Sequence, residues 1–195
     1  METQGGYYSV ADVVWNETAT PSTLTGVVGN GEVTAYGVDE AYEYSTPFST
    51  YKLPLSGYLI IDVAVSGGSA VIGLGYTIIQ SGAYRPPQVV WFDNVTIAPD
   101  SPVVSAFIEA YNGRLTGSGR PMSLELVFGG YGNGEITTFK SLSAELALAY
   151  WDGSGWASPP SIYDYSLNPV GSATDLRVLM QGSVATVSTG SQIQA

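Results

Sequence analysis

Apolar side chains recur at every second position along most of this chain, and this alternation limits the fold more than any other feature. One run has an aliphatic residue at alternate positions: Leu59, Ile61, Val63 and Val65. Another places Val89, Trp91, Asp93, Val95 and Ile97 on one predicted face. Because successive side chains of a strand point to opposite faces, period two predicts β-strands. Even residues 142–150, which have fair helix propensity, alternate and are predicted to form a strand.

Several of these runs are apolar on both faces, which is typical of inner strands in two packed sheets. Turn signals such as Ser66-Gly67-Gly68 and Trp151-Asp152-Gly153 separate the runs. The predicted fold is therefore all-β, a jelly-roll-like sandwich of two sheets. Residues 1–195 are expected to form a single domain.

Two short motifs occur twice and in the same order. Gly29-Asn30-Gly31 is echoed by Gly132-Asn133-Gly134, and the segment that begins at Asp12 is echoed by the one that begins at Asp93. An Asn-Gly pair supplies the positive φ angles of a tight hairpin, so each copy predicts such a turn. The echoes indicate an internal duplication, with repeats at about residues 10–50 and 90–150.

The composition excludes many kinds of chemistry. The 195 residues include no His and no Cys, which removes catalytic triads that use histidine, thiol catalysis and the usual zinc ligands. Seventeen acidic residues against six basic ones give a net charge of −11, which disfavours nucleic acid or an anionic membrane as partner. No apolar run is long enough to span a membrane. No cofactor or metal is expected, and carboxylates, hydroxyls, amides and tyrosines remain for catalysis.

Three carboxylates are candidates for acid–base chemistry. Asp93 stands on an apolar face, where a solvated Asp is unexpected. Glu125 lies between Leu124 and Leu126 and is the proposed partner of Asp93. Asp12 echoes Asp93 in the first repeat and could form a carboxylate pair with it. Two neighbouring carboxyls acquire separate pKa values, so that one can give a proton while the other takes one. The alternatives are that Asp93 accepts backbone N–H bonds in its turn and that Glu125 faces solvent or pairs across strands.

Other residues are candidates for binding or modification. Glu109, Gln80 and Trp91 could line a substrate groove, although Gln80 could instead satisfy backbone groups. Asn16 and Asn94 begin Asn-x-Thr triplets and are candidate glycosylation sites. An acidic run interleaved with tyrosines, Asp39, Glu40 and Glu43, is interpreted as a solvated loop because it lacks the spacing of a calcium loop. The segment 182–195 could be an edge strand or the start of a Ser/Thr-rich tether.

Several separated motifs resemble the thermopsin family. They occur in order and cover most of the chain: residues 51–61 (YKLPLSGYLII), 74–80 (LGYTIIQ), 93–97 (DNVTI), 124–134 (LELVFGGYGNG), and 146–161 (LALAYWDGSGWASPPS). The resemblance implies a secreted acid endopeptidase of hot, acidic archaeal habitats. Family members usually carry further strands ahead of the segment that resembles residues 12–16, so the first repeat is expected to lack its leading strands.

Two functions follow as hypotheses. The first is an extracellular acid endopeptidase that hydrolyses polypeptides with carboxylate chemistry. The second is a non-catalytic extracellular subunit of a filament or surface layer. There a neighbour's segment, such as residues 1–10 or 182–195, would add a strand to an unfilled sheet edge.

Overall fold

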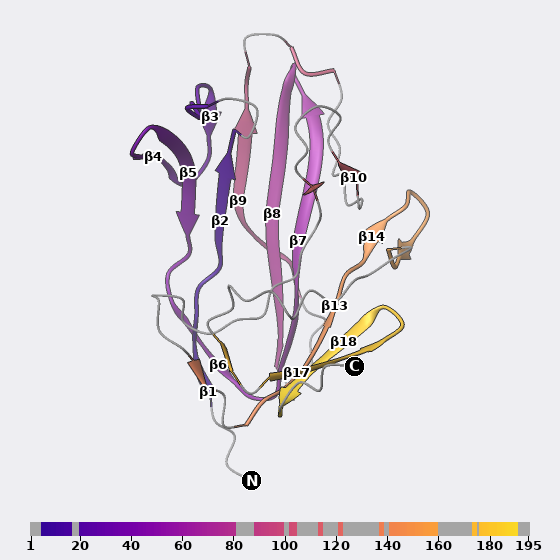
Figure 1. The fold of residues 1–195 in the computed structure, drawn as a ribbon. Coiled ribbons are helices and arrows are strands. Elements are labelled where there is room, and N and C mark those ends of the chain that lie inside the picture. Colours follow the sequence, from indigo (N-terminus) through magenta and orange to yellow (C-terminus); the bar gives the residue numbers. More distant parts are fainter. Residues whose placement is uncertain are drawn as a thin grey trace. The chain divides into compact units, whose positions relative to one another are not determined.

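A computed structural model describes residues 5–16, 20–80, 88–99, 102–104, 141–159 and 176–190, with the backbone of short strands at 113–114, 121–122, 137–138 and 173–174 (Figure 1). The secondary-structure elements within these residues are all β-strands, and this confirms the all-β prediction. These residues contain no helix that is long and apolar enough to cross a membrane. The chain divides into two compact units, residues 1–108 and 109–195. The single domain, the duplication and the sandwich stay predictions.

The described residues of unit 1 form three sheets. Their strands are β1 (Gly5–Tyr8), β2 (Ala11–Trp15), β3 (Val27–Val28), β4 (Glu32–Tyr36), β5 (Asp39–Ser45), β6 (Ser49–Lys52), β7 (Leu55–Ser66), β8 (Ser69–Gln80) and β9 (Val90–Ile97). Sheet order is β2-β5-β4 in the first, β3-β9-β8-β7 in the second, and β1-β6 in a two-stranded ribbon. All strand pairs that the structure describes in this unit are antiparallel.

The longest hairpin of unit 1 joins β7 to β8, which lie side by side in Figure 1. Its pairing extends from Leu55 opposite Gln80 to Ser66 opposite Ser69. The two residues of the turn, Gly67 and Gly68, have φ angles of 59° and 83°. Two positive φ angles in succession match the twist of the flanking strands, and glycine adopts them without steric cost. The turn predicted at Ser66-Gly67-Gly68 is therefore confirmed.

A β-bulge in β9 changes which of its side chains face inward. Leu74 pairs with Asp93, but the next residue of β8, Gly75, pairs with Trp91, so Phe92 is the extra residue. The bulge turns both Phe92 and Asp93 to the buried face, and leaves Trp91 and Asn94 exposed. The prediction that Trp91 shares a face with Asp93 is wrong, because a strict alternation takes no account of an inserted residue.

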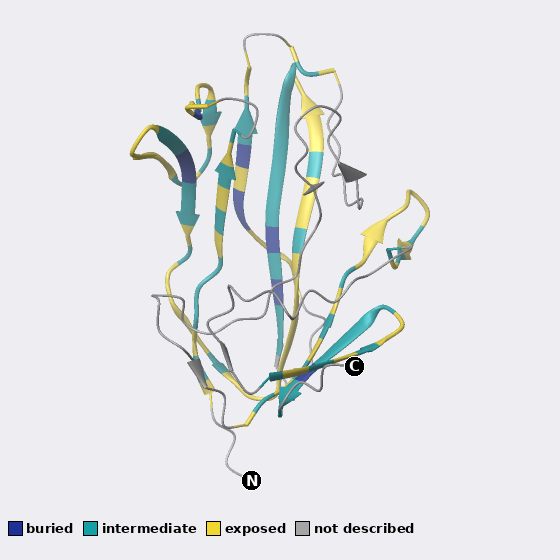
Figure 2. Ribbon diagram, in the orientation of Figure 1, coloured by how far each residue is buried: buried dark blue, intermediate teal, exposed yellow. Residues whose placement is uncertain are grey.

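The buried core of unit 1 lies where β5 meets β9. Ala41, Tyr42, Phe92 and Val95 are its buried apolar and aromatic side chains, and buried parts of β5, β8 and β9 are dark in Figure 2. The ring of Tyr44 stacks on Phe92 with centroids 6.3 Å apart, and Phe92 in turn contacts Tyr76 at 6.0 Å. These side-chain contacts join the β2-β5-β4 sheet to the β3-β9-β8-β7 sheet.

The segment Gly29-Asn30-Gly31 connects these two sheets. It follows β3, which pairs with β9, and precedes β4, which pairs with β5. Neither glycine has a positive φ angle. The predicted tight hairpin at this Asn-Gly pair is wrong, because the strands on its two sides belong to different sheets. The second copy, at residues 132–134, lies outside the described residues.

Unit 2 contains shorter strands: β10 (Gly113–Arg114), β11 (Pro121–Met122), β12 (Thr137–Thr138), β13 (Ser143–Ala147), β14 (Tyr150–Trp151), β15 (Trp156–Ala157), β16 (Ala173–Thr174), β17 (Leu176–Gln181) and β18 (Val184–Thr189). The largest sheet among the described residues of this unit has the order β13-β18-β17. Thus β18 is a central strand with partners on both sides. The prediction of an edge strand in residues 182–195 is wrong, because Val184–Thr189 fills the gap between β13 and β17.

Candidate active site

The carboxylate of Asp93 is enclosed between the two sheets. The residue is 2% exposed and accepts three hydrogen bonds within unit 1. Its Oδ1 accepts the backbone N–H of Asn30 at 2.9 Å and that of Asn94 at 2.7 Å. Its Oδ2 accepts a short hydrogen bond from the hydroxyl of Tyr42. These three donors satisfy a buried carboxylate that would otherwise lack hydrogen-bond partners in this interior.

Tyr42, from the β2-β5-β4 sheet, contacts the carboxylate of Asp93. It is 1% exposed, lies on β5, and its hydroxyl also accepts the N–H of Gly31 at 2.7 Å. Burial and the hydrogen bond to Asp93 raise the pKa of the Tyr42 hydroxyl above its ordinary value of 10.0. The hydroxyl therefore keeps its proton and remains a donor to Asp93 at neutral and acidic pH.

The segment Gly29-Asn30-Gly31, the crossover between the two sheets, also surrounds the carboxylate of Asp93. The side-chain amide of Asn30 donates to the carbonyl of Phe92 at 2.8 Å, while its backbone N–H binds Asp93. A Cβ atom on Gly29 would collide with the Tyr42 hydroxyl and lie 3.0 Å from Asp93 Oδ1. A Cβ atom on Gly31 would collide with the carbonyl oxygen of Glu43. Both glycines are thus required by close approach, which lets the backbone reach the carboxylate.

Asp12 approaches the same site from β2. It lies opposite Tyr44 in the β2–β5 ladder, on the face that also carries Val14 and Tyr42. Both of its carboxylate oxygens are buried, and no N–H or hydroxyl group of the described residues donates a hydrogen bond to either of them. Burial, the charge of Asp93 and a hydrogen bond to Asp93 raise the pKa of Asp12 from 3.8 to about 6.

The lack of a donor to Asp12 and its raised pKa are both explained if Asp12 and Asp93 share one proton. Two ionised carboxylates offer only acceptors to each other, and a bond between them forms once one of them is protonated. The raised pKa makes Asp12 the member that carries the proton below about pH 6. The site then presents a protonated Asp12 beside Asp93, which accepts hydrogen bonds from three donors.

The other sequence candidates lie elsewhere. Glu109 and Glu125 are outside the described residues, so the proposed Asp93–Glu125 pair stays a prediction. Gln80 ends β8, with only its backbone described. Trp91 and Asn94 lie on the outer face of the sheet, away from the carboxylate of Asp93. Asn16 is half-buried, and its amide donates to the carbonyl of Thr23 at 3.3 Å. Glycosylation at Asn16 and Asn94 stays a prediction.

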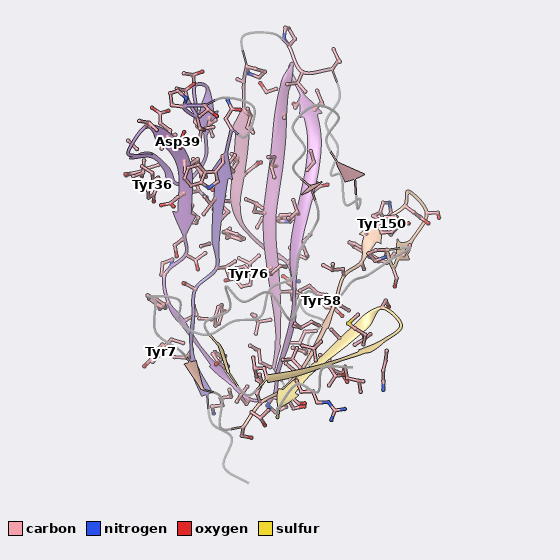
Figure 3. The ribbon with its side chains drawn as sticks, in the orientation of Figure 1. Tyr7, Tyr36, Asp39, Tyr58, Tyr76 and Tyr150 are labelled. Atoms are coloured by element: carbon pink, nitrogen blue, oxygen red, sulfur yellow. The ribbon has the colours of Figure 1, made fainter. Side chains whose placement is uncertain are left out.

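The acidic run interpreted as a loop is a strand. Asp39, Glu40 and Glu43 belong to β5, and Figure 3 labels Asp39 near Tyr36, its cross-strand partner in the β4–β5 hairpin. Asp39 accepts the N–H of Ser22 at 2.6 Å, and Glu40 accepts that of Leu24 at 2.9 Å. The loop interpretation was wrong because residues 39–45 pair with both β2 and β4, and Asp39 and Glu40 bind backbone N–H groups of residues 22 and 24. Among the described residues no three metal-ligating side chains come together.

Sequence reasoning named Asp12 and Asp93 but missed Tyr42 and Asn30 as their neighbours. Tyr42 was overlooked because it lies within the acidic run that was interpreted as a loop, and Asn30 because it lies in a segment that was predicted to be a turn. The one available signal was the alternation of Tyr42 and Tyr44 along β5, which marks one inward face. The contact itself depends on how the two sheets pack.

The described part of unit 1 is all-β and brings two carboxyl side chains, Asp12 and Asp93, close together in its interior, and the full sequence contains no histidine or cysteine. The sequence matches the family model described as Thermopsin over residues 1–176. The thermopsin of Sulfolobus acidocaldarius (strain ATCC 33909) is 31% identical over 187 residues, which cover 94% of this chain and 55% of that protein. The chain therefore belongs to the thermopsin family and spans about half the length of this relative. No solved structure matches it.

Proposed function

We propose that the chain is a thermopsin-like acid endopeptidase domain in which Asp12 and Asp93 perform the acid–base chemistry. Membership of the thermopsin family supports a peptidase, and the buried carboxylate pair supplies the groups. The observation that carries the assignment is the placement of Asp12 against Asp93, two carboxyls from different strands with unequal surroundings. Unequal surroundings separate an acid from a base at one pH.

The chemistry would proceed in two steps. Ionised Asp93 takes a proton from a water molecule whose oxygen attacks the peptide carbonyl carbon, and Asp12 gives its proton to the carbonyl oxygen. In the second step Asp93 returns its proton to the peptide nitrogen while the C–N bond breaks. Asp12 recovers a proton from one hydroxyl of the intermediate, so both carboxyls end in their starting states. Tyr42 keeps Asp93 oriented through both steps by its hydrogen bond.

This mechanism sets a pH range. Asp12 must be protonated at the start of the reaction, and it loses its proton as the pH rises through about 6. Activity should therefore decline above about pH 6, which is the behaviour of an acid peptidase. We also propose that the enzyme acts outside the cell, as the family resemblance implies, with unfolded polypeptide as substrate.

The mechanism requires that water and a peptide reach carboxylates that are buried between the sheets. Asp93 is 2% exposed, so the two sheets must part locally for substrate to enter. A pair that only joins the sheets would hold the same proton without catalysis. Variants that preserve shape distinguish these two roles.

The test uses Asp12→Asn and Asp93→Asn in the full chain, assayed on a denatured protein substrate from pH 2 to pH 7. Each amide keeps the shape of the carboxyl but cannot exchange a proton, so we expect each variant to lose about 10²-fold or more in rate. Glu145→Gln, an exposed carboxyl on β13, is the control and should retain full activity. Full activity in folded Asp12→Asn and Asp93→Asn would exclude the pair from catalysis and return attention to Glu125.

The non-catalytic subunit is the weaker alternative. Its strand donor at the C-terminal end, residues 182–195, includes β18, which already pairs with β13 and β17. Its donor at the other end, residues 1–10, includes β1, which pairs with β6. Neither strand is free among the described residues, so we do not extend the proposal to assembly.

A further inference from the structure

A small open groove lies on the outer face of the β3-β9-β8-β7 sheet, opposite to the face that carries the carboxylate of Asp93. Its volume is about 210 Å³, and its lining is Asp62, Ala64, Val71, Gly73, Trp91, Asp93 and Asn94. Asp93 borders it, but the carboxylate of Asp93 is occupied by Asn30, Asn94 and Tyr42. The groove is thus separate from the proposed active site.

The lining residues form an ordered row across three strands. Asp62 of β7 pairs with Gly73 of β8, and Gly73 pairs with Asn94 of β9. A Cβ atom on Gly73 would lie 3.3 Å from Cζ3 of Trp91 and 3.7 Å from Cβ of Asp62. Gly73 therefore forms a floor, with an indole ring on one side and a carboxylate on the other.

The bulge in β9 places the indole there. Trp91 is the partner of Gly75, and a Cβ atom on Gly75 would lie 2.8 Å from its Cε3. The ring thus lies over Gly73 and Gly75, close to the sheet, and it remains 54% exposed. One face of the indole thus lies against glycine backbone while the other face is open to solvent. A ring fixed in this way is a preformed surface on which a ligand can stack.

The two polar side chains beside the platform are available. Asp62 and Asn94 are exposed, and neither side chain makes a hydrogen bond or ion pair with another described residue. The carboxylate offers acceptors, and the amide offers two donors and one acceptor. Adjacent hydroxyls of a sugar are each donor and acceptor, so this pair matches them.

We propose that this groove binds a neutral carbohydrate, with one pyranose ring stacked on Trp91 and its hydroxyls bonded to Asp62 and Asn94. The C–H groups on one face of a pyranose are slightly positive and pack on the negative face of an indole. A net charge of −11 disfavours anionic sugars. The amide donors of Asn94 favour hydroxyl oxygens over a cation. This inference is independent of the proposed peptidase activity.

The test titrates the full chain with cellotetraose and with mannotriose and follows binding by calorimetry and by tryptophan fluorescence. The protein is produced in a host that does not N-glycosylate. We expect at least one sugar to bind with a Kd of about 0.1–1 mM, with little change between low salt and about 0.5 M salt. Absence of binding by both sugars at about 20 mM would overturn the proposal.

Variants locate the binding. Trp91→Ala should weaken it about tenfold or more, and Asp62→Ala and Asn94→Ala, both at exposed positions, should each weaken it several-fold without loss of folding. Trp151→Ala removes a similarly exposed tryptophan of β14 and should leave the Kd unchanged. Equal binding by all three groove variants would overturn the site. So would salt-sensitive binding of a lysine-rich peptide in place of sugar, or a glycan found on Asn94 of the native protein by mass spectrometry.

Discussion

The hydroxyl of Tyr42 joins three parts of unit 1. It donates to Asp93 on β9, accepts from Gly31 in the crossover, and belongs to β5. Removal of a buried hydroxyl leaves its partners without a bond, which costs more than an average hydrogen bond contributes.

We expect Tyr42→Phe to lower the free energy of unfolding by about 1–3 kcal/mol, because Asp93 and the Gly31 N–H each lose a partner. Urea unfolding at constant pH measures the effect. Tyr58→Phe removes the hydroxyl of a tyrosine that is 64% exposed on β7 and should change stability little. Equal stability of wild type and Tyr42→Phe would show that the hydroxyl does not hold the sheets.

We expect Asp12 to make unit 1 more stable in acid than at neutral pH. Its pKa is about 6 in the folded chain against an ordinary 3.8, so folding favours the protonated form. The stabilisation is complete below about pH 3.8 and is lost as the pH rises through about 6. We expect the midpoint of thermal unfolding to decrease from pH 4 to pH 7.

The Asp12→Asn variant tests this expectation directly. Asn stays neutral at every pH, so the variant should lose most of that pH dependence and melt higher than wild type at pH 7. Melting curves at pH 4, 5, 6 and 7 for both proteins supply the comparison. A wild-type protein that melts higher at pH 7 than at pH 4 would contradict the raised pKa.

At the scale of elements, two local features decide where the site forms: the bulge in β9 and the crossover Gly29–Gly31. The bulge presents Asp93 inward and Trp91 outward from neighbouring positions. The crossover brings two backbone N–H groups to Asp93 and Tyr42 because its glycines allow close approach.

We expect Gly31→Ala to destabilise the protein by about 1–3 kcal/mol or more, because its Cβ would collide with the backbone carbonyl of Glu43. Gly155→Ala is the matched control, since Gly155 has an ordinary φ angle and no atom within 4 Å of the added Cβ. Chemical denaturation of the two variants gives the comparison. A Gly31→Ala variant as stable as Gly155→Ala would show that the crossover has room to move.

The sequence predicts the strands better than the site. Alternation found β7, β9 and β13, and it singled out Asp93 because an acidic residue interrupts an apolar face. It assigned Trp91 to the wrong face because the inserted residue, Phe92, lies between Trp91 and Asp93 and breaks the alternation there. The contacts of Asp93 with Tyr42 and Asn30 could not be predicted, because strands far apart in sequence meet only when the sheets pack.

At the scale of the whole molecule, charge determines behaviour in solution. The 17 acidic and 6 basic side chains give an isoelectric point near 4.1. We expect solubility to pass through a minimum near pH 4, where mutual repulsion between molecules vanishes. Light scattering from pH 2.5 to pH 7 measures it. Scattering that stays flat through pH 4 would show that surface charge does not control association.

The position of β18 also has a consequence for biosynthesis. Each described strand of unit 1 pairs with strands that end by residue 97, so these sheets can form while later residues are still being added. In unit 2, β13 pairs with β18 alone in its sheet among the described strands, and β18 comes after β17 in the chain. As the chain emerges from the ribosome, β13 must therefore wait with an unpaired edge until β18 arrives. The β13-β18-β17 sheet can thus be completed only after the described sheets of unit 1 have all their strands.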